Sequence, residues 1–261
     1  MANNHGRLKE DEMFINLNGK KVSEITPNLF HMMEELFGAL EPNEVITCSQ
    51  PEDYIKPDLL ITYKGNTKGI SMKTSTSEIV HTEYVSTFVK FLEEIGVSQE
   101  TRDAILLYHF GDGTKDGTGS YRMSIDEVRF RYRDLIKEAN TELNSDPEII
   151  TKIVDRLVFD GVNPDAAKAD ALYHGDIYYG IIITRKQVHK HILRKVWDKY
   201  DNLHVGPLFL RAHARYVGVE VRNEKYHQHI DAKWARLLAD MEYISKCYFS
   251  YTPLNRRTYP E

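Results

Sequence analysis

The chain has 261 residues, a net charge of −5 and a hydrophobic content of 41%. Its two cysteines, Cys48 and Cys247, exclude a disulfide framework and a cysteine-based metal site. No apolar run approaches the ~18 residues that a membrane-spanning helix needs, and the first residues do not resemble a secretory signal peptide. We therefore expect a soluble globular protein that resides in the reducing cytoplasm and does not bind membranes.

The charge is unevenly distributed along the chain. Residues 185–257 contain 15 Lys and Arg against 7 Asp and Glu, and they hold 6 of the 11 histidines. The rest of the chain is strongly acidic, because the whole carries 34 basic and 39 acidic residues. A basic segment of this size favours a surface that faces a polyanion such as nucleic acid. A charged, solvated face without a partner is the alternative.

The N-terminal part predicts a loose segment, a helix and a β-hairpin. The first two dozen residues are polar and are expected to be loose. A helix is predicted over 26–40, where Thr26 suits the N-cap position. Two strands follow, 58–63 and 69–74, and the short turn between them at Lys64-Gly65-Asn66 predicts a hairpin.

The middle of the chain reads as mostly helical. Ser75 and Glu78 have the spacing of a capping box, which predicts a helix from there to about Ile95. Further helices are predicted at 99–109, 124–143 and 146–159. A glycine-containing loop at 111–120 separates the first of these from the second.

The C-terminal part returns to strands. A run of β-branched and aromatic residues predicts a strand at 176–185, and a basic helix follows it. Alternation predicts another strand at 209–215 and a shorter one at 219–222. The last helix is predicted from Ile230 to Tyr248.

Two lone charges in the predicted hairpin point to chemistry. Because side chains alternate along a strand, Ser71 and Lys73 share one face, and a suitable register brings Asp58 beside them. A carboxylate at that place can bind Mg²⁺, with water and a substrate phosphate completing the octahedron. A neighbouring lysine can orient the attacking water and stabilise the charge on phosphorus.

These residues resemble the motif of a known nuclease superfamily. Pro57-Asp58, twelve intervening residues and Ser71-Met72-Lys73 are similar to the PD-(D/E)XK pattern. The resemblance covers residues 26–95 and implies a restriction-endonuclease-like α/β fold, with a central mixed β-sheet flanked by helices. It also implies that Asp58 is a metal ligand and Lys73 the catalytic lysine. We expect one domain over 1–261, with a catalytic core at 26–95, a helical insertion at 98–172 and a basic, DNA-contacting part at 176–257.

Ser71 departs from the family's pattern, which usually has an acid at this position. In some relatives the acid has moved to the following helix, so Glu78 or Glu83 can replace it here as a catalytic residue and metal ligand. Glu34 or Glu35 on the first helix can add a further carboxylate. The remaining interpretation is a fold that binds without cutting.

The basic C-terminal part supplies candidate DNA contacts. Arginine suits bidentate contact with guanine in the major groove, and a strand that carries arginines can enter that groove. The basic helix is expected to hold phosphates, which position a protein without reading sequence. The candidates for base contacts are Arg211, His213, Arg215 and Arg222, and those for phosphate contacts include Lys190, Arg194 and Lys195.

We therefore predict a Mg²⁺-dependent DNA endonuclease, similar to a Type II restriction enzyme, for which Mn²⁺ substitutes. Its partner is double-stranded DNA, and a homodimer is expected if the target is palindromic. Two alternatives stay open. One is a junction or repair nuclease that selects DNA by structure, and the other is a non-catalytic nucleic-acid-binding protein with the same fold.

Overall fold

The structure is a computed structural model that describes residues 4–51, 55–73, 78–197 and 201–248. Contacts divide the chain into two units. The first unit comprises Met1–Thr76, Ala167–Lys190 and Leu238–Glu261, and the second comprises Ser77–Ala166 and His191–Leu237. The predicted segments 26–95, 98–172 and 176–257 do not coincide with these units. Within the described residues, no helix is long and apolar enough to cross a membrane, and Cys48 and Cys247 are free thiols.

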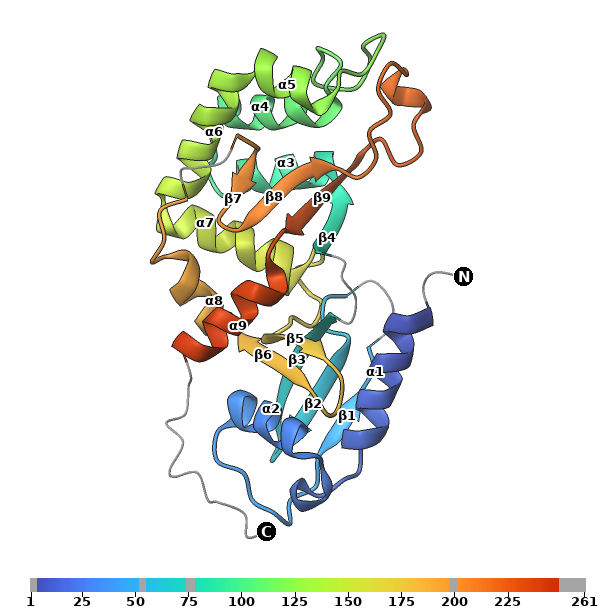
Figure 1. The fold of residues 1–261 in the computed structure, drawn as a ribbon, viewed down its shortest axis with the longest axis vertical. Helices are drawn as coiled ribbons and strands as arrows, with labels where there is room; N and C mark the ends of the chain where they lie inside the picture. Colours follow the sequence, from blue (N-terminus) through green and yellow to red (C-terminus); the bar gives the residue numbers. More distant parts are fainter. Residues whose placement is uncertain (1–3, 52–54, 74–77, 198–200, 249–261) are drawn as a thin grey trace. The chain divides into compact units, whose positions relative to one another are not determined.

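The first unit is built on a five-stranded mixed sheet (Figure 1). Its strand order is β1-β2-β3-β5-β6, with β3 and β5 parallel and every other neighbouring pair antiparallel. The predicted α/β class with a central mixed sheet is thereby confirmed. The strands are β1 (Thr47–Ser49), β2 (Leu59–Tyr63), β3 (Asn66–Lys73), β5 (Ala171–Gly175) and β6 (Gly180–Thr184).

The predicted hairpin is confirmed as β2 and β3. Tyr63 pairs with Asn66, so only Lys64 and Gly65 form the turn, and their φ angles are +47° and +76°. Two successive positive φ values define the turn type whose twist matches that of the flanking strands. Glycine adopts this conformation without strain, so Gly65 is the residue that the turn requires.

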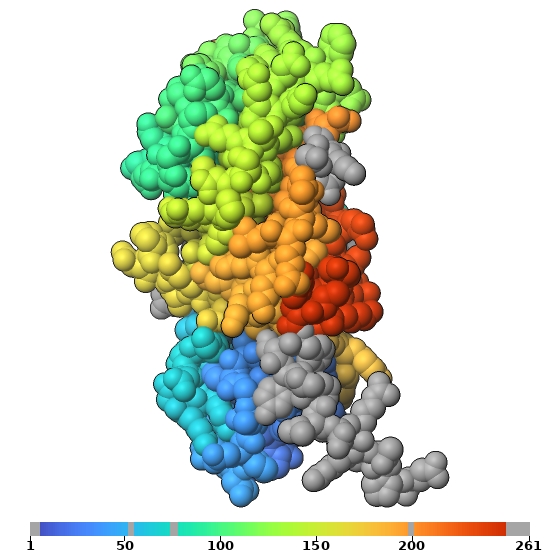
Figure 2. All heavy atoms as spheres, turned by 90° about the vertical axis from the view of Figure 1, so that its left-hand side faces the viewer, coloured from blue at the N-terminus to red at the C-terminus, as the bar shows by residue number. Residues whose placement is uncertain are grey.

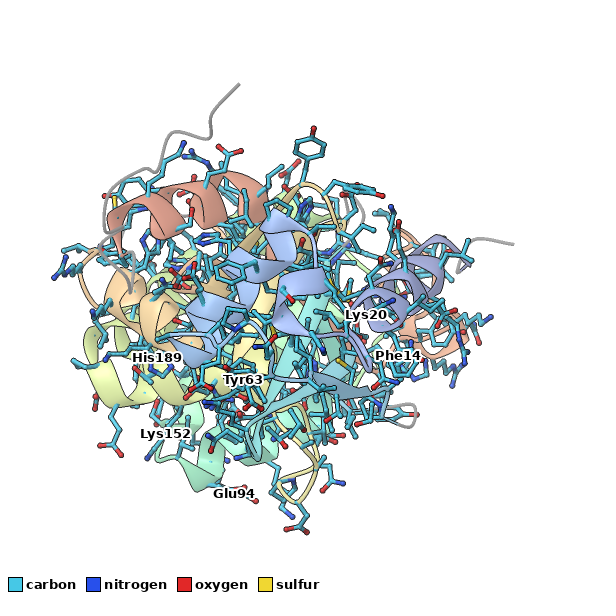
Figure 3. The ribbon with its side chains drawn as sticks, turned by 90° about the horizontal axis from the view of Figure 1, so that it is seen from below. Phe14, Lys20, Tyr63, Glu94, Lys152 and His189 are labelled. Atoms are coloured by element: carbon cyan, nitrogen blue, oxygen red, sulfur yellow. The ribbon has the colours of Figure 1, made fainter. Side chains whose placement is uncertain are left out.

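Two helices cover one face of this sheet. They are α1 (Asn4–Leu17) and α2 (Pro27–Phe37), and a short 3-10 turn, η1 (Val22–Glu24), lies between them in the chain. Met13 and Leu17 of α1 are fully buried in the core formed with the sheet. From Asn4 onward, the expectation of a loose N-terminal segment is therefore wrong: this short apolar stripe is enough to hold a helix in place. Figure 3 labels Phe14 of α1, which packs against the same core, and Tyr63 of β2.

The second unit has a separate antiparallel sheet with the order β4-β9-β8-β7. In Figure 2, the yellow-green atoms of α6 adjoin orange atoms of the segment around residues 190–210 on one face of this unit, and α6 contacts β7. The strands are β4 (Ile79–Tyr84), β7 (His204–Val205), β8 (Leu208–Ala212) and β9 (His229–Trp234). The helices are α3 (Val85–Glu94), α4 (Gln99–Phe110), α5 (Ile125–Arg131), α6 (Arg133–Ser145), α7 (Pro147–Val154) and the π-helical η2 (Asp155–Asp160).

Several helix predictions in this unit are confirmed, and their caps show why. Ser98 caps α4 and accepts from Thr101 N, and Ser124 begins α5 with a capping box. Asp146 caps α7 directly before Pro147. In each case a side chain accepts a hydrogen bond from a backbone N–H that the helix itself leaves unpaired. Beyond β6 the chain continues as α8 (Arg185–Ile192), which begins in the first unit and ends in the second. Later elements are the short η3 (Val221–Asn223) and α9 (Leu237–Cys247).

The structure corrects four element predictions. The stretch predicted as one helix to Ile95 starts with strand β4, and the capping residues before it at 75–77 lie outside the described residues. The stretch predicted as a helix from Ile230 likewise begins with strand β9, which pairs with β4 on one side and with β8 on the other. Strand 176–185 is shorter, because Asp176 Oδ1 accepts from Tyr178 N and Tyr179 N in a turn before β6. The segment 219–222 is not a strand but leads into η3. Tertiary pairing overrides local helical periodicity at the first two sites.

A buried ion pair holds two loops of the second unit together. Arg122 and Glu224 bond directly, and both side chains are 0% exposed. The Arg122 guanidinium also donates to the carbonyls of Phe110 at 2.8 Å, His109 at 2.6 Å and Ala214 at 2.8 Å. Burial lowers the pKa of Arg122 to about 9, so at neutral pH the guanidinium remains charged.

Removing one partner of this pair is expected to destabilise the fold by about 3–5 kcal/mol, because the other charge stays buried and unpaired. The variants are Arg122→Met and Glu224→Gln, measured by urea unfolding. Lys90→Met is the control, since it removes a partner from the exposed Lys90–Glu94 pair at 4.0 Å and should cost less than about 0.5 kcal/mol. Equal costs for the buried and the exposed pair would contradict this account.

Candidate active site

Asp58 and Ser71 meet across the hairpin. Leu59 pairs with Ile70, and Asp58, directly before β2, donates from its backbone N–H to Ile70 O at 2.8 Å. Asp58 and Ser71 are the chain neighbours of the core residues Leu59 and Ile70, so alternation directs both side chains away from that core. One carboxylate oxygen of Asp58, Oδ2, accepts from Met72 N at 2.5 Å. Within the described residues, no hydrogen bond to its other oxygen, Oδ1, occurs.

Lys73 lies two residues beyond Ser71 on β3 and therefore on the same face of the sheet. It is half-buried, and its neighbour on the parallel strand β5 is His174. In the part of the chain that the structure describes, no carboxylate forms an ion pair with the Lys73 ammonium. The structure thus gathers Asp58, Ser71 and Lys73 at the ends of two neighbouring strands.

A third charged group reaches this site from α1. Glu10 is half-buried and lies on the same stripe of the helix as Met13 and Leu17, which pack on the sheet. Its pKa is raised above the ordinary value, first by burial and then by the negative charge of Asp58, while the positive charge of Lys73 acts in the opposite direction. The three groups therefore lie close enough to act on one another electrostatically.

The donor set fits a hard divalent cation. Two carboxylates, Asp58 and Glu10, repel each other, and a cation between such groups reverses this penalty. Mg²⁺ is usually held by one or two carboxylates together with water and substrate phosphate. Consistent with so sparse a set, the described residues contain no group of three or more His, Cys, Asp or Glu side chains that is arranged to hold a metal ion.

The two acids proposed to replace the one missing at Ser71 belong to the second unit, and both are already paired there. Glu83 of β4 is only 5% exposed and accepts from Arg156 NH2 at 2.7 Å and from Arg156 Nε at 3.1 Å. Burial alone would raise the pKa of Glu83, but the hydrogen bonds from His81 and Arg156 outweigh it and hold the pKa below its usual value. Glu78 pairs with Lys233 at 2.9 Å.

Glu35, the candidate on α2, is also engaged elsewhere. Its side chain is buried, and Oε2 accepts from Gln187 Nε2 of α8 at 3.2 Å. Gln187 is itself fixed by the Thr184 backbone N–H and the Tyr248 carbonyl. No contact of Glu35 with Asp58 or Lys73 occurs within the described ranges, and its role in the site remains a prediction.

The second unit presents a polar sheet face around a buried carboxylate. Asp231 of β9 is 0% exposed and is bonded by His213 Nδ1 at 2.9 Å, by Thr82 Oγ1 at 2.7 Å and, more weakly, by Arg211 at 3.4 Å. Arg211 and His213 remain exposed and lie on the same face. Asp231 therefore orients a cation and an imidazole toward solvent.

The remaining DNA-contact candidates fall into different environments. The prediction that Arg215 continues the strand face is wrong, because β8 ends at Ala212 and the Arg215 guanidinium donates to the carbonyls of Tyr108, His109 and Met123. Arg222 is exposed and pairs with Glu220 at 2.6 Å. Lys190 belongs to α8 and is exposed, as are Arg194 and Lys195 beyond the end of that helix.

Sequence reasoning missed Glu10 and Asp231. For Glu10 the available signal was the 3- and 4-residue spacing that puts it on one helix face with Met13 and Leu17. The polarity of the first two dozen residues hid that stripe. For Asp231, the strand β9 was read as part of a helix, so its alternation with Lys233 was not recognised.

Comparisons with known proteins support the fold. No protein-family model matches the chain, and no curated protein matches it. A solved structure of restriction endonuclease MspI in complex with its cognate DNA is similar, with a TM-score of 0.51 and 14% sequence identity over 89% of this chain and 93% of that one. The chain therefore has a restriction-endonuclease-like fold, as the hairpin motif predicted.

Glu10→Gln is expected to raise the free energy of unfolding at neutral pH. The fold raises the pKa of Glu10 above 4.5, so the ionised carboxylate destabilises the folded state wherever the unfolded one is also ionised. This penalty is complete above the raised pKa and disappears as the pH falls below 4.5. Urea unfolding at about pH 7 and about pH 3.5 measures the difference.

The control is Glu12→Gln, which removes a carboxylate of the same helix that pairs with Lys9 at 2.9 Å. Its loss should lower stability slightly, by a few tenths of a kcal/mol at about pH 7. A loss of stability in Glu10→Gln at neutral pH would show that Glu10 is stabilised, not penalised, by its surroundings.

Proposed function

We propose that this protein is a divalent-metal-dependent DNA endonuclease of the Type II restriction class, with Mg²⁺ as the metal and Mn²⁺ as its substitute. The observation that carries the proposal is the meeting of Asp58, Ser71 and Lys73 at the ends of β2 and β3, where the charge of Glu10 on α1 also acts on Asp58 and Lys73. The fold is shared with an enzyme whose structure holds its cognate DNA. That likeness supports DNA as the partner.

The residues of the site divide the work of hydrolysis. Asp58 and Glu10 would hold the ion, which when bound supplies a Lewis acid and an acidified water. Lys73 donates from its ammonium to the phosphate oxygens, where negative charge grows as water attacks. Glu10 would serve in its ionised form as the second anionic ligand of that ion.

Ser71 contributes a neutral hydroxyl where the motif's acid usually stands. A hydroxyl both donates and accepts, so it can hold a water or a phosphate oxygen, but it adds no negative charge. Glu10 on α1 provides the second carboxylate in its place. The structure thus favours a helix-borne acid in the first unit over Glu78 and Glu83, which are paired in the second.

We propose that the face of the second unit's sheet that carries Arg211 recognises the DNA sequence. Arg211 suits guanine O6 and N7 in the major groove, and the buried Asp231 restricts its orientation. Such a strand contact supplies base discrimination, while exposed cations such as Arg194 supply phosphate contacts. A homodimer is proposed for a palindromic target, since the symmetry of the protein then mirrors that of the DNA.

Plasmid cleavage in Mg²⁺ tests the proposal. The wild-type protein should yield discrete bands, and Lys73→Ala should cut at least about 100-fold more slowly, the usual effect of removing one group that stabilises transition-state charge. Lys68→Ala is the matched control, because Lys68 lies on the same strand but pairs with Asp170 at 3.0 Å. It should cut at the wild-type rate.

In the same assay, Arg211→Ala should retain cleavage chemistry and relax or shift the sites that are cut. Undiminished cutting by Lys73→Ala would refute the site assignment.

Ser71 also motivates a second candidate, a protein that binds DNA without cutting it. Tight binding by the wild type with no cleavage in Mg²⁺ or Mn²⁺ would support that function instead.

A further inference from the structure

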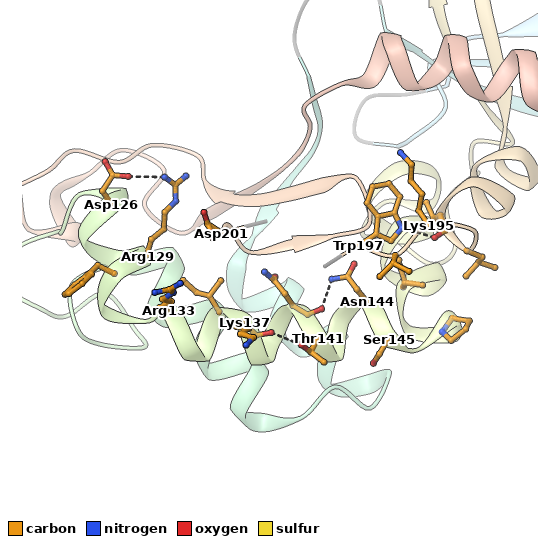
Figure 4. A pocket seen from close by; sticks show the side chains of 18 residues that line it. Asp126, Arg129, Arg133, Lys137, Thr141, Asn144, Ser145, Lys195, Trp197 and Asp201 are labelled. Atoms are coloured by element: carbon orange, nitrogen blue, oxygen red, sulfur yellow. Dashed lines mark hydrogen bonds and ion pairs between the residues drawn. The ribbon is translucent and has the colours of Figure 1, made fainter. Parts of the chain in front are cut away.

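A large groove lies in the second unit. Its volume is about 1210 Å³, and α5 and α6 line one wall while residues 192–197 line the other (Figure 4). All of its lining residues belong to the second unit. Figure 4 shows Asp126 and Arg129 at one end of the groove, and Trp197 with Lys195 at the other.

The groove is lined by basic side chains on both walls. Arg133, Lys137 and Thr141 lie at four-residue intervals on α6, so they follow one another along a single helix face, about 6 Å apart. Among the residues that the structure describes, no carboxylate forms an ion pair with Arg133 or Lys137. Lys195 faces them from the opposite wall, where its ammonium lies 4.9 Å from the centre of the Trp197 ring.

Two acids also line the groove, but they do not cancel this charge. Asp126 pairs with Arg129 at 3.0 Å, and the same guanidinium bonds the side-chain oxygen of Asn202. Asp201 is exposed. Four cations against two carboxylates leave a positive lining, and the two cations on α6 are uncommitted within the described part of the chain.

Apolar side chains project at the rim of the same groove. Phe130 is 87% exposed and Val196 is 82% exposed. Full exposure of a phenyl ring costs free energy, because apolar surface remains in water. An exposed aromatic beside uncommitted cations is the combination with which proteins bind single-stranded nucleic acids, the cations holding the backbone and the ring stacking on a base.

We infer that this groove binds a single strand of nucleic acid, with phosphates on Arg133, Lys137 and Lys195 and a base on Phe130. Sites for small molecules usually measure about 300–1,000 Å³, so the groove exceeds what one small anion fills. A duplex hides its base faces in the stack and offers none to Phe130, whereas a single strand offers every base. The inference rests on the groove's own charge and shape, and it goes beyond the proposed cleavage.

Fluorescence anisotropy with a labelled dodecamer of deoxythymidine tests the inference on the full chain. The protein is kept in chelator, so no cleavage is needed and the outcome does not depend on Asp58 or Lys73. Wild type should bind with an affinity that falls as salt rises. The double variant Arg133→Gln/Lys137→Gln should lose about 1.4 from the slope of log K against log salt, since each contact to a single strand contributes about 0.7.

The matched control is Lys90→Gln/Lys152→Gln, which changes the net charge by the same amount at exposed lysines outside the groove. Its slope and affinity should equal those of the wild type. Equal behaviour of the two double variants would overturn the inference, because binding would then follow overall charge alone. Absence of oligonucleotide binding by the wild type would overturn it as well.

Phe130 separates a single strand from a duplex. Phe130→Ala should weaken binding of the dodecamer about 5-fold or more, and Phe130→Trp should restore it, because base stacking needs only an aromatic face. A blunt duplex of the same length should compete poorly. If the duplex competes as well as the single strand and Phe130→Ala binds normally, the groove is a general phosphate-binding surface and the single-strand assignment is wrong.

Discussion

The register of the β2–β3 hairpin is the constraint on which the candidate site depends. A two-residue turn at Lys64 and Gly65 sets Tyr63 opposite Asn66. Lys73 follows seven positions later, at the end of β3. A slip of one residue would turn every side chain of β3 to the other face of the sheet. Met72 would then leave the core, and Ser71 and Lys73 would enter it. Burial of Ile70 and Met72 therefore holds the reactive face in place.

The site in the first unit has few charged groups, and the fold holds each of them in place. The described part of the site contains two carboxylates and one lysine, with a serine where a further acid is usual. Asp58 is anchored by a backbone N–H, so its free oxygen is oriented at little cost in entropy. Glu10 is placed by a helix whose other residues on the same stripe are core residues. A pKa raised by burial and by a neighbouring carboxylate is common at functional sites, although structural networks produce such shifts too, as the lowered pKa of Glu83 in the second unit illustrates.

The sequence predicted this arrangement well where local signals agreed. The turn chemistry at Lys64 and Gly65 and the alternation around Ser71 gave the hairpin and the shared face. Capping residues such as Ser124 and Asp146 located the helix starts. The failures have a common physical cause. β4 and β9 owe their extended form to pairing with strands far away in the chain, and no local window contains that information.

The same limit explains what was missed in the site. Glu10 is more than 40 residues away from Asp58 in the sequence, and only the packing of α1 on the sheet brings their charges together. Arg215 was expected to face DNA, yet three carbonyl oxygens of the second unit bind its guanidinium. A charged residue in a basic segment is predictable from sequence, but whether the fold has already paired it is not.

Divalent-metal binding tests the central claim most directly, because it needs neither the correct DNA sequence nor turnover. In titration calorimetry, the wild-type chain should bind Mn²⁺. Asp58→Asn should fail to bind it and Glu10→Gln should bind it more weakly, since each substitution removes one anionic ligand. Glu83→Gln should bind as the wild type does, because its carboxylate is already paired with Arg156. Unchanged Mn²⁺ binding in Asp58→Asn, or loss of binding only in Glu83→Gln, would contradict the account.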